Sequence, residues 1–273
     1  MVCFPHCKIN IGLHIHAKRK DGFHDIESVF YPLPLYDALE IVVADEMHFS
    51  QEGIAIPGAT DQNIVLKAYQ LLKNDYPNLP LIRIALLKNI PTGAGLGGGS
   101  ADGAEMLTML NRHFNLQLNI SQLTAYAAQL GSDCPFFILN KPAYVTGRGE
   151  NLEPISLDLS QYHFVIVKPP IHIATAWAFA QIKPNQREAD LCDRIMAPIH
   201  TWHSYITNDF EIPIFNHYPE IMQIKKSLYQ LGAVYSQMSG SGSAVYGIFE
   251  TKPSIDLLKQ TFKDAKVILC ASK

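Results

Sequence analysis

The amino-acid sequence predicts an α/β protein of two domains, and three observations support this class. Apolar and polar residues alternate over short runs such as Leu81–Leu87, which is the period of a β-strand. Other segments, such as Ile64–Leu72, repeat apolar residues every three or four positions, which is the period of a helix. The chain of 273 residues is also long enough for two compact domains, which we place at residues 1–153 and 154–273.

Strands are predicted for the first part of the chain. Lys8–His16 alternates, and the charged turn Lys18–Gly22 begins a return of the chain through Asp-Gly, a strong short-range hairpin signal. The further strands are expected at Asp25–Phe30, Tyr36–Ala44 and Phe49–Pro57.

The next part of the chain is expected to form a helix, a strand and a second helix. The first runs from Asn63 and stops before Pro77, and the strand Leu81–Leu87 and a glycine-rich loop follow. The loop leads into a second helix, whose apolar face carries Ala104, Leu107, Leu110 and Phe114.

Two more helices are expected before the predicted boundary. Ser121 is the expected cap of one helix, which ends at Gly131. Asp133 begins the other, with Pro135 in its first turn, and the polar residues 146–150 then carry the chain into the second half. There the expected elements are a strand at His163–Lys168, helices at Ala174–Gln181, Leu191–Tyr205 and Ile221–Leu231, a glycine-rich turn within Tyr235–Phe249, a helix at Ser254–Phe262 and a strand at Val267–Cys270.

The glycine-rich loop is the most informative feature of the chain, because five glycines occur within the eight residues from Gly93 to Ser100. Glycine tolerates positive φ, so consecutive N–H groups can turn toward one anion. The N-terminus of the following helix adds partial positive charge. We therefore expect this loop to hold the phosphates of a nucleotide.

Two well-known nucleotide-binding motifs fit the spacing of this loop poorly. A Walker loop is excluded, because Gly99 stands where the lysine after Gly98 is required. Gly93, Gly95 and Gly98 satisfy the GxGxxG pattern of a dinucleotide site, but helical patterns follow where that site needs a second strand. A dinucleotide-binding oxidoreductase and a purely structural glycine turn stay open as alternatives from the residues alone.

Composition argues for a small-molecule enzyme. The net charge of -3 and the short basic cluster at residues 18–20 argue against nucleic acid and anionic membranes as partners. No apolar run reaches the roughly 18 residues of a membrane span, and the N-terminus lacks the pattern of a signal peptide, so we expect a cytoplasmic protein. Five scattered cysteines indicate reduced thiols, and the Cys and His residues near the N-terminus fit no common zinc-finger spacing.

Four segments, in their order and at their separations, resemble the GHMP kinase superfamily over essentially the whole chain. They are CKINIGLHI with KRKDGFHDIES, PTGAGLGGGSAD, LGSDCPFF and MSGSGSAVYGIF, and NDFE at residues 208–211 also fits. The resemblance implies an N-terminal domain with a mixed sheet, a C-terminal ferredoxin-like domain and an active site in a cleft between them. The combination of LGSDCPFF and DGFH resembles the branch that phosphorylates a cytidyl-diphosphate sugar alcohol.

The resemblance implies transfer of the γ-phosphoryl group of ATP to the tertiary C2 hydroxyl of a methylerythritol unit, a step in isoprenoid precursor synthesis. Such an alcohol needs a group that takes its proton and cations that spread the developing charge. In the family these roles belong to an aspartate, here Asp133, and a lysine, here Lys8. From the residues alone, Asp133 could be a helix cap and Lys8 could lie on a solvated strand face.

Binding residues are carried over in the same way. The substrate side is assigned to Asn10, Phe23, His24, Thr175 and Phe179, and to Gly240, Ser241 and Gly242 of the last motif. The adenine side is assigned to Asn63 and Lys88, and the phosphates to Pro91, Gly93, Ala94, Gly95, Leu96, Gly97, Gly98, Gly99, Ser100 and Ala101. Mg²⁺ is expected with ATP, held chiefly by phosphate oxygens and Ser100.

Several of these positions could equally have a purely structural role. Aromatic residues at the spacing of Phe179 are common in cores, and residues 240–242 could be only a tight strand turn. Phe23 stands where family members more often have tyrosine, so a contact through a phenol hydroxyl is lost while stacking survives.

Two rival functions stay open within the same fold. One is another GHMP small-molecule kinase of the mevalonate or homoserine type, and the other is a catalytically silent binding protein. Retention of both Lys8 and Asp133 argues against a silent protein, because pure binding needs neither. We expect a small-molecule substrate and a monomer or weak homodimer.

Overall fold

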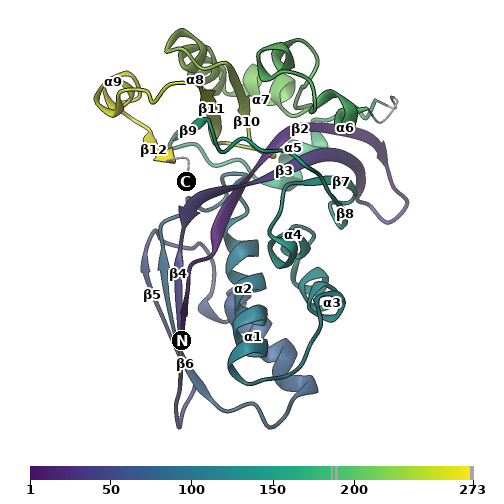
Figure 1. Cartoon of the computed structure of the whole chain (residues 1–273), viewed down its shortest axis with the longest axis vertical. Helices are drawn as coiled ribbons and strands as arrows, with labels where there is room; N and C mark the ends of the chain where they lie inside the picture. The colour runs from purple at the N-terminus through teal and green to yellow at the C-terminus, as the bar shows by residue number, and fades with distance from the viewer. Residues whose placement is uncertain (186, 188–189, 271–273) are drawn as a thin grey trace. The chain divides into compact units, whose positions relative to one another are not determined.

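The computed structural model describes residues 1–185, 187 and 190–270. Its helices and strands group into two compact units, each built from several stretches of chain (Figure 1). Unit 1 comprises residues 1–7, 35–92 and 97–141, and unit 2 comprises residues 8–34, 93–96 and 142 onward. The family-based domain boundary after residue 153 stays a prediction.

Unit 1 contains a mixed four-stranded sheet in the order β1-β4-β6-β5. Its strands are β1 (Val2–Cys3), β4 (Ala38–Val43), β5 (His48–Gly53) and β6 (Ile82–Lys88). β4 is antiparallel to both β1 and β6, whereas β5 is parallel to β6. The mixed sheet implied by the family resemblance is therefore confirmed.

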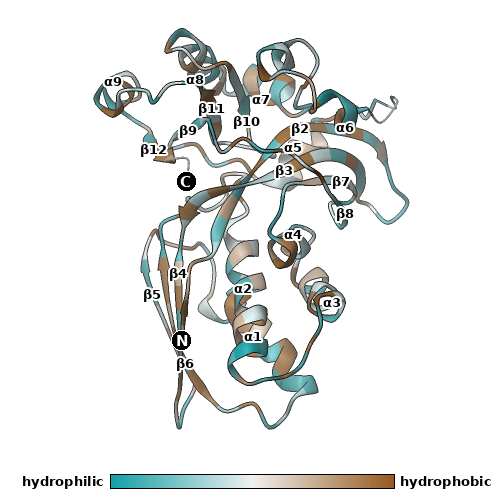
Figure 2. Cartoon of the chain, viewed as in Figure 1, coloured by the Kyte–Doolittle hydropathy of each residue, from teal (hydrophilic) through white to brown (hydrophobic). Residues whose placement is uncertain are grey.

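Helices cover one face of this sheet. Along β6, Ile82, Ile84 and Leu86 are buried while Arg83 and Leu87 are exposed, so the strand has one apolar and one open face. Hydrophobic residues of β4 and β6 appear as brown bands in Figure 2. The helices are α1 (Ile64–Asp75), α2 (Gly98–His113), α3 (Ile120–Leu130) and α4 (Cys134–Leu139), and α2 packs against the other three.

Unit 2 contains two four-stranded sheets. One has the order β2-β3-β7-β8 and consists of most of β2 (His6–Lys18) and β3 (His24–Tyr36), with β7 (Ala143–Gly147) and β8 (Asn151–Pro154). The other has the order β10-β11-β9-β12 with antiparallel pairs throughout. Its strands are β9 (His163–Lys168), β10 (Tyr235–Met238), β11 (Val245–Phe249) and β12 (Lys266–Cys270).

The second sheet of unit 2 has ferredoxin-like topology. In chain order, helices follow β9, then come β10 and β11 as a hairpin, then another helix and β12 at the edge beside β9. The helices of unit 2 are α5 (Thr175–Ala180), α6 (Leu191–Arg194), α7 (Glu211–His217), α8 (Pro219–Gln230) and α9 (Ile255–Thr261). Buried Val165, Val167, Ile224, Leu228 and Val245 belong to its core. The predicted ferredoxin-like domain is thus confirmed.

The cap predicted for α3 is wrong. The helix begins at Ile120, and Asn119 is its cap: the Asn119 side chain accepts a hydrogen bond from Gln122 N, and the Gln122 side chain accepts one from Asn119 N. This reciprocal pair satisfies two backbone donors, whereas Ser121, two residues later, lies inside the helix that Asn119 caps. Asparagine and serine both fit a cap, so only the position of glutamine three residues on discriminates between them.

Three regions of the second half also differ from prediction. The polar residues 146–150 do not form a long crossing: residues 146 and 147 end β7, and residues 148–150 form the turn between β7 and β8. Residues 191–205 form α6 and a separate 3₁₀-helix, Ile199–Ser204, because Pro198 interrupts the predicted helix. Helix α7 was not predicted, since Pro213 lies inside a segment of only seven residues.

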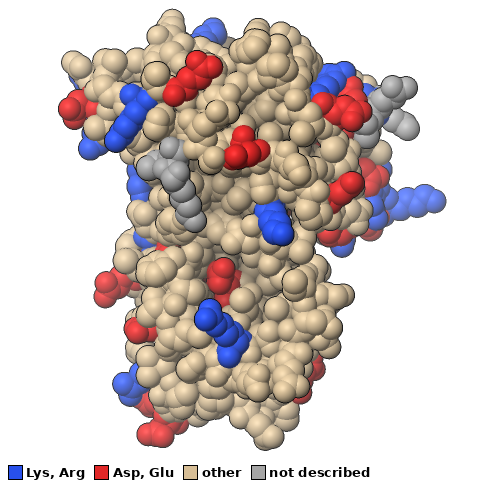
Figure 3. All heavy atoms as spheres, viewed as in Figure 1, with Lys and Arg blue, Asp and Glu red and all other residues tan. Residues whose placement is uncertain are grey.

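Acidic and basic side chains are interspersed on the face shown in Figure 3, without a continuous basic area among the described residues of that face. No helix in residues 1–185, 187 and 190–270 combines the length and apolar character of a membrane span.

A buried carboxylate, that of Glu27, joins the first sheet of unit 2 to the start of helix α6. Glu27 is 1% exposed, and its oxygens accept hydrogen bonds from Tyr144 Oη (2.8 Å) and Leu191 N (2.9 Å) and lie 3.1 Å from Nδ1 of His14. Burial alone would raise the pKa of Glu27, but the hydrogen bonds from His14, Leu191 and Tyr144 outweigh it and lower the pKa to about 2.

We expect Glu27→Gln to lower the free energy of unfolding by about 2–3 kcal/mol at pH 7, because an ionised Glu27 is stabilised by its donors. The folded pKa lies below the unfolded value, so this stabilisation is present above about pH 4.5 and is lost as the pH falls toward 2. Urea unfolding at pH 7, 5, 4 and 3 measures this stabilisation. The exposed Glu40→Gln is the matched control, and a Glu27→Gln deficit that stays constant down to pH 3 would contradict this assignment.

Candidate active site

The first half of the glycine-rich loop is held by its carbonyl oxygens in unit 2. Ala94 O accepts from Ala244 N (3.2 Å), and Gly95 O accepts from the Ser239 hydroxyl (2.7 Å). Leu96 O accepts from the backbone N–H of Lys8 (2.9 Å). A phosphate accepts hydrogen bonds from backbone N–H groups. These contacts use the carbonyl oxygens of the loop instead, so they hold the loop without occupying its N–H donors.

Gly95 is required where the loop meets the turn between β10 and β11. Its φ is +78°, and a Cβ atom there would lie 1.9 Å from the carbonyl oxygen of Ser239. No side chain fits at that distance, and the backbone conformation also disfavours one. The close approach therefore depends on glycine.

The second half of the loop begins helix α2 in unit 1. Gly97 has φ +70° at the N-cap position, and its carbonyl accepts from Ala101 N at 2.9 Å. Gly98, Gly99 and Ser100 form the first turn, whose N–H groups and helix dipole favour an anion. Both halves of the loop thus have the conformation predicted for a phosphate cradle, while their binding role stays a prediction.

Lys88, predicted on the adenine side, lies inside unit 1 with two carboxylates. Its ammonium group donates to Asp37 and, at 2.6 Å, to Asp102 of α2. Asp37 also accepts from the backbone N–H groups of Asn89 (2.6 Å) and Ile90 (2.8 Å). This ion-pair network joins the start of β4, the end of β6 and the first turns of α2, directly beneath the loop.

One lysine cannot neutralise two buried carboxylates. Burial raises the pKa of Asp102 to about 8, and Lys88 opposes this increase only in part. Lys88 therefore serves to support the base of α2. Asn63, the other residue predicted on the adenine side, caps α1 by accepting from Val65 N at 2.9 Å.

Lys8 lies in β2 and is 3% exposed, which excludes a solvated strand face. Its Nζ donates to Oδ1 of Asn10 at 2.5 Å and lies 4.3 Å from the centre of the Phe30 ring. Lys8 and Asn10, two residues predicted in the site, are therefore in direct contact. Their spacing of two residues places both side chains on one face of the strand.

Asp133 stands at the N-cap position of α4 in unit 1. It has φ -83° and ψ -15°, and its side chain makes no capping hydrogen bond in the described structure. A capping side chain normally accepts from the first turn of the helix with the residue in the β region. The alternative role of Asp133 as a helix cap is therefore not supported, and its catalytic role stays a prediction.

Aromatic side chains predicted to bind cytidine meet in unit 2. The rings of His24 and Phe179 stack with centroids 4.8 Å apart at 19°, and Phe210 packs edge-on against Phe179 at 4.9 Å. Phe23 is 51% exposed, and the Arg148 guanidinium lies 4.8 Å from its ring centre. Phe210 and Arg148 were not predicted as site residues. Residues 208–211 matched a family motif, but the sequence did not indicate which side chains Phe210 would contact.

The last predicted motif is the turn between β10 and β11. Gly240 and Gly242 have positive φ, and the Ser241 hydroxyl lies 3.2 Å from that of Thr175. Asn208 holds the turn: its Nδ2 donates to the carbonyls of Met238 and Gly240, each at 2.8 Å. Asn208 is 2% exposed, and its amide donates to two backbone carbonyls of the turn, which supplies hydrogen bonds to buried acceptors.

The residues that the structure describes offer few ligands to a magnesium ion. Among the described residues no group of three or more His, Cys, Asp or Glu side chains could hold a metal ion. The Ser100 side chain hydrogen-bonds with the Cys134 thiol, whose pKa burial raises to about 12. One hydroxyl does not meet the octahedral oxygen demand of Mg²⁺, so this donor set fits only a metal that enters with nucleotide phosphates.

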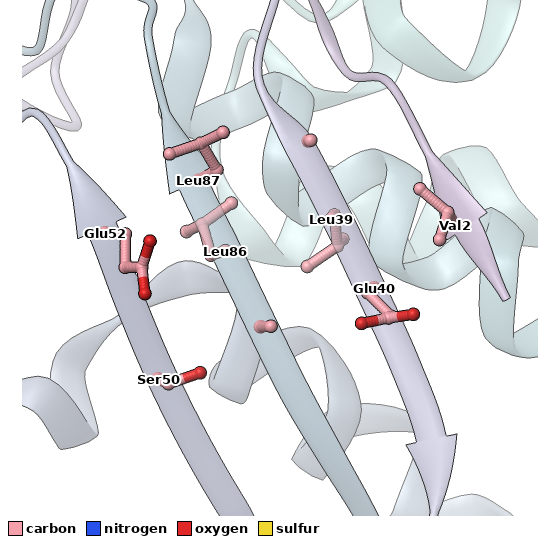
Figure 4. Close-up of a pocket in the computed structure, with 9 residues that line it drawn as sticks. Val2, Leu39, Glu40, Ser50, Glu52, Leu86 and Leu87 are labelled. Atoms are coloured by element: carbon pink, nitrogen blue, oxygen red, sulfur yellow. The ribbon is translucent and has the colours of Figure 1, made fainter.

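Hollows on the open face of the unit 1 sheet do not fit a triphosphate. One, of about 300 Å³, is lined by β1, β4, β5 and β6, and Figure 4 shows the carboxylates of Glu40 and Glu52 at its sides. No basic side chain lines it, so a polyanion would be repelled. A second hollow of about 580 Å³ includes Lys88 and, among apolar residues, Phe4, Tyr36 and Leu87.

We expect Gly95→Ala to destabilise the protein by more than about 2 kcal/mol and to weaken ATP binding, because its Cβ would collide with a backbone carbonyl. Gly99→Ala is the matched control within the same loop. A Cβ there meets nothing within 4 Å, and alanine favours the helix, so its free energy of unfolding should rise by about 0.5–1 kcal/mol. Urea unfolding and ATP titration test this, and equal effects of the two changes would refute the packing argument.

Comparison with known proteins supports one family. The model of the GHMP kinases N terminal domain matches residues 63–141, and that of the GHMP kinases C terminal matches residues 195–267. A 4-diphosphocytidyl-2-C-methyl-D-erythritol kinase of Azobacteroides pseudotrichonymphae is 52% identical over 251 residues, covering 92% of this chain and 94% of that protein.

Solved structures agree with this relationship. A crystal structure of 4-(cytidine 5'-diphospho)-2C-methyl-D-erythritol kinase superposes with a TM-score of 0.81 at 27% identity, covering 99% of this chain and 98% of the other. Mevalonate kinase of Methanococcus jannaschii superposes with a TM-score of 0.73 over 100% and 98% of the chains, but at 13% identity it shares the fold alone. The family predicted from the motifs is confirmed: the chain belongs to the 4-diphosphocytidyl-2-C-methyl-D-erythritol kinases of the GHMP kinase superfamily.

Proposed function

We propose that this protein phosphorylates the C2 hydroxyl of 4-diphosphocytidyl-2-C-methyl-D-erythritol with ATP, in the synthesis of isoprenoid precursors. The observation that carries the proposal is the 52% identity to a relative of that name over nearly the full length of both chains. A substrate of the mevalonate type is less well supported, because the likeness to mevalonate kinase at 13% identity concerns the fold alone.

ATP and its metal enter as one substrate in this proposal. The N–H groups of residues 93–100 bind the phosphate chain, and the N-terminus of α2 stabilises its negative charge. Mg²⁺ bound together with ATP would supply positive charge against the negative charge that develops during transfer. The Ser100 hydroxyl is the protein group assigned to the metal, and its hydrogen bond with Cys134 still leaves an oxygen lone pair for that role.

The chemical step needs a base and a cation at the acceptor hydroxyl. Asp133 takes the hydroxyl proton, the oxygen forms a bond to the γ-phosphorus, and the bond from that phosphorus to the β–γ bridging oxygen breaks to leave ADP. The Lys8 ammonium stabilises the negative charge on the attacking oxygen, as a compact point charge can. Support for Lys8 comes from its buried, oriented ammonium, and support for Asp133 from a side chain that does not cap its helix.

Cytosine recognition is assigned to the aromatic group of unit 2. His24 and Phe179 are stacked directly on each other, and a base between them would require a separation of about 7 Å, two ring contacts of about 3.5 Å. The base therefore stacks on the outer face of one ring or separates the pair. Burial and the nearby Lys18 lower the pKa of His24, which favours a neutral imidazole able to hydrogen-bond a base.

We expect Lys8→Ala and Asp133→Ala each to lower turnover by about 100- to 10,000-fold while ATP still binds, because each removes a group that acts on the reacting atoms. Steady-state ADP release and ATP titration measure the two effects separately. The matched controls are Lys259→Ala and Asp256→Ala on α9, which change the same residue types at exposed positions. Turnover within threefold of the unchanged protein in either site variant would reject that residue's role.

The acceptor is tested directly by comparing substrates. We expect ADP release with 4-diphosphocytidyl-2-C-methyl-D-erythritol to exceed release with mevalonate or homoserine by at least about 1,000-fold in kcat/KM, because only the first offers a cytosine to the aromatic group. A coupled ADP assay with the purified protein gives these values. Preference for mevalonate or homoserine would replace the proposed substrate, and ATP binding without turnover on any acceptor would indicate a silent binding protein.

A further inference from the structure

The side chains around Lys8 contain a positioning device that none of the assigned roles uses. Lys8 and Asn10 lie on β2, and Ser28 and Phe30 lie on the neighbouring strand β3. All four are at most 3% exposed. Buried polar groups of this kind are costly unless each finds a partner, so their hydrogen bonds define one arrangement.

Ser28 determines which end of the Asn10 amide faces Lys8. The Ser28 hydroxyl donates its single proton to the carbonyl of Gly12 at 2.7 Å. Its oxygen can therefore only accept from Asn10, and the Asn10 Nδ2 lies 2.9 Å away as the donor. This leaves Oδ1 of Asn10 pointing at Nζ of Lys8, at 2.5 Å.

The opposite amide orientation would be unfavourable at both ends. The Asn10 NH₂ group would then face the Lys8 ammonium, donor against donor. The Asn10 oxygen would face the Ser28 oxygen, and Ser28 could bond with it only by leaving the Gly12 carbonyl unsatisfied. An unsatisfied buried polar group costs about 1–3 kcal/mol, enough to populate one orientation almost completely.

Phe30 adds a second constraint on the ammonium. Its ring centre lies 4.3 Å from Lys8 Nζ, within the range of a cation–π interaction. Ser28 and Phe30 are two residues apart on β3, so both face the same side of that strand. One strand thus carries the lysine and the other supplies the ring and the hydroxyl that orients its amide partner.

We infer that Ser28 is a positioning residue, which acts through Asn10 to hold the Lys8 ammonium in one direction. The side chain of Asn10 is engaged with Lys8 and Ser28, so its part in the reaction is to orient the lysine. This inference rests on the proposed function only where it concerns turnover; the holding of the ammonium does not depend on it.

Turnover tests the inference through a double-mutant cycle. We expect Ser28→Ala to lower kcat by about 10- to 100-fold, with both KM values within about twofold, because a displaced ammonium misses the transition state and not the bound substrates. In the Asn10→Asp background, Ser28→Ala should lower kcat by less than about threefold. A carboxylate offers Lys8 an oxygen in either orientation, so Ser28 has nothing left to select.

Ser236→Ala is the matched control for the loss of a buried hydroxyl. Ser236 is also 0% exposed, and its hydroxyl donates to the carbonyl of Tyr246 at 2.8 Å, in contact with neither Lys8 nor Asn10. We expect its kcat to stay within twofold. A kcat loss in Ser236→Ala as large as in Ser28→Ala would overturn the inference, as would equal effects of Ser28→Ala in the two backgrounds.

A spectroscopic readout separates the inference from the proposed function. A buried, hydrogen-bonded ammonium exchanges its protons slowly with water, so the Lys8 Nζ of ¹⁵N-labelled protein should give an NMR signal that Lys8→Arg removes. We expect Ser28→Ala to broaden or shift that signal while the signal of Lys88, paired with carboxylates in unit 1, is unchanged. An unchanged Lys8 signal would overturn the inference. A lost Lys8 signal with unchanged kcat would support the holding of the ammonium and reject its role in catalysis.

Discussion

The close approach of Gly95 to the Ser239 carbonyl is the constraint on which the candidate site in unit 2 depends. Because the loop and the β10–β11 turn pack backbone against backbone, three successive loop carbonyls at residues 94–96 find donors from Ala244, Ser239 and Lys8. The loop is therefore joined to the strand that carries the lysine by hydrogen bonds within the protein itself. Contacts of this kind restrict a loop's backbone, and a preorganised loop loses less conformational entropy when it binds a ligand.

Two buried lysines near the loop illustrate different uses of the same side chain. Lys88 lies between Asp37 and Asp102, and this network supports the base of α2. The contacts of Lys8 described above are to a neutral amide and an aromatic ring, which orient an ammonium without themselves cancelling its charge. Two lysines at a similar degree of burial thus contact carboxylates in one case and an amide and a ring in the other, so burial alone does not indicate what a lysine does.

Sequence patterns predicted the elements whose signals are local. The alternation before the loop and the helices expected from Asn63 and Ser254 all depend on residues within a few positions of each other, and the structure has a strand and two helices there. Ser28, Asn208 and Asp37 could not be found in this way, because their partners Gly12, Gly240 and Lys88 lie 16, 32 and 51 positions away. A serine or asparagine within a strand or loop carries no signal of such a partner.

The motif resemblance predicted more of the candidate site than periodicity did, but it did not predict the hydrogen-bond partners of the site residues. It brought Lys8 and Asn10 together as site residues, and the structure places their side chains in contact. The assignment of Asn10 to the substrate stays a prediction, and its amide also contacts Ser28. It placed Lys88 on the adenine side, where two carboxylates engage its ammonium. A motif preserves which residue stands at a position, while hydrogen-bond partners decide what the side chain can still do.

Asn10 connects the two requirements of phosphoryl transfer in unit 2. Its backbone N–H donates to the Ser239 hydroxyl at 3.2 Å, the same hydroxyl that donates to the loop at Gly95, and its side chain orients Lys8. The Tyr246 hydroxyl donates to its carbonyl at 3.0 Å, so the residue is fixed from several directions. A movement of the loop would therefore be transmitted to the ammonium through three hydrogen bonds. Phosphoryl transfer depends mainly on positioning, and these hydrogen bonds fix the position of the Lys8 ammonium relative to the glycine-rich loop.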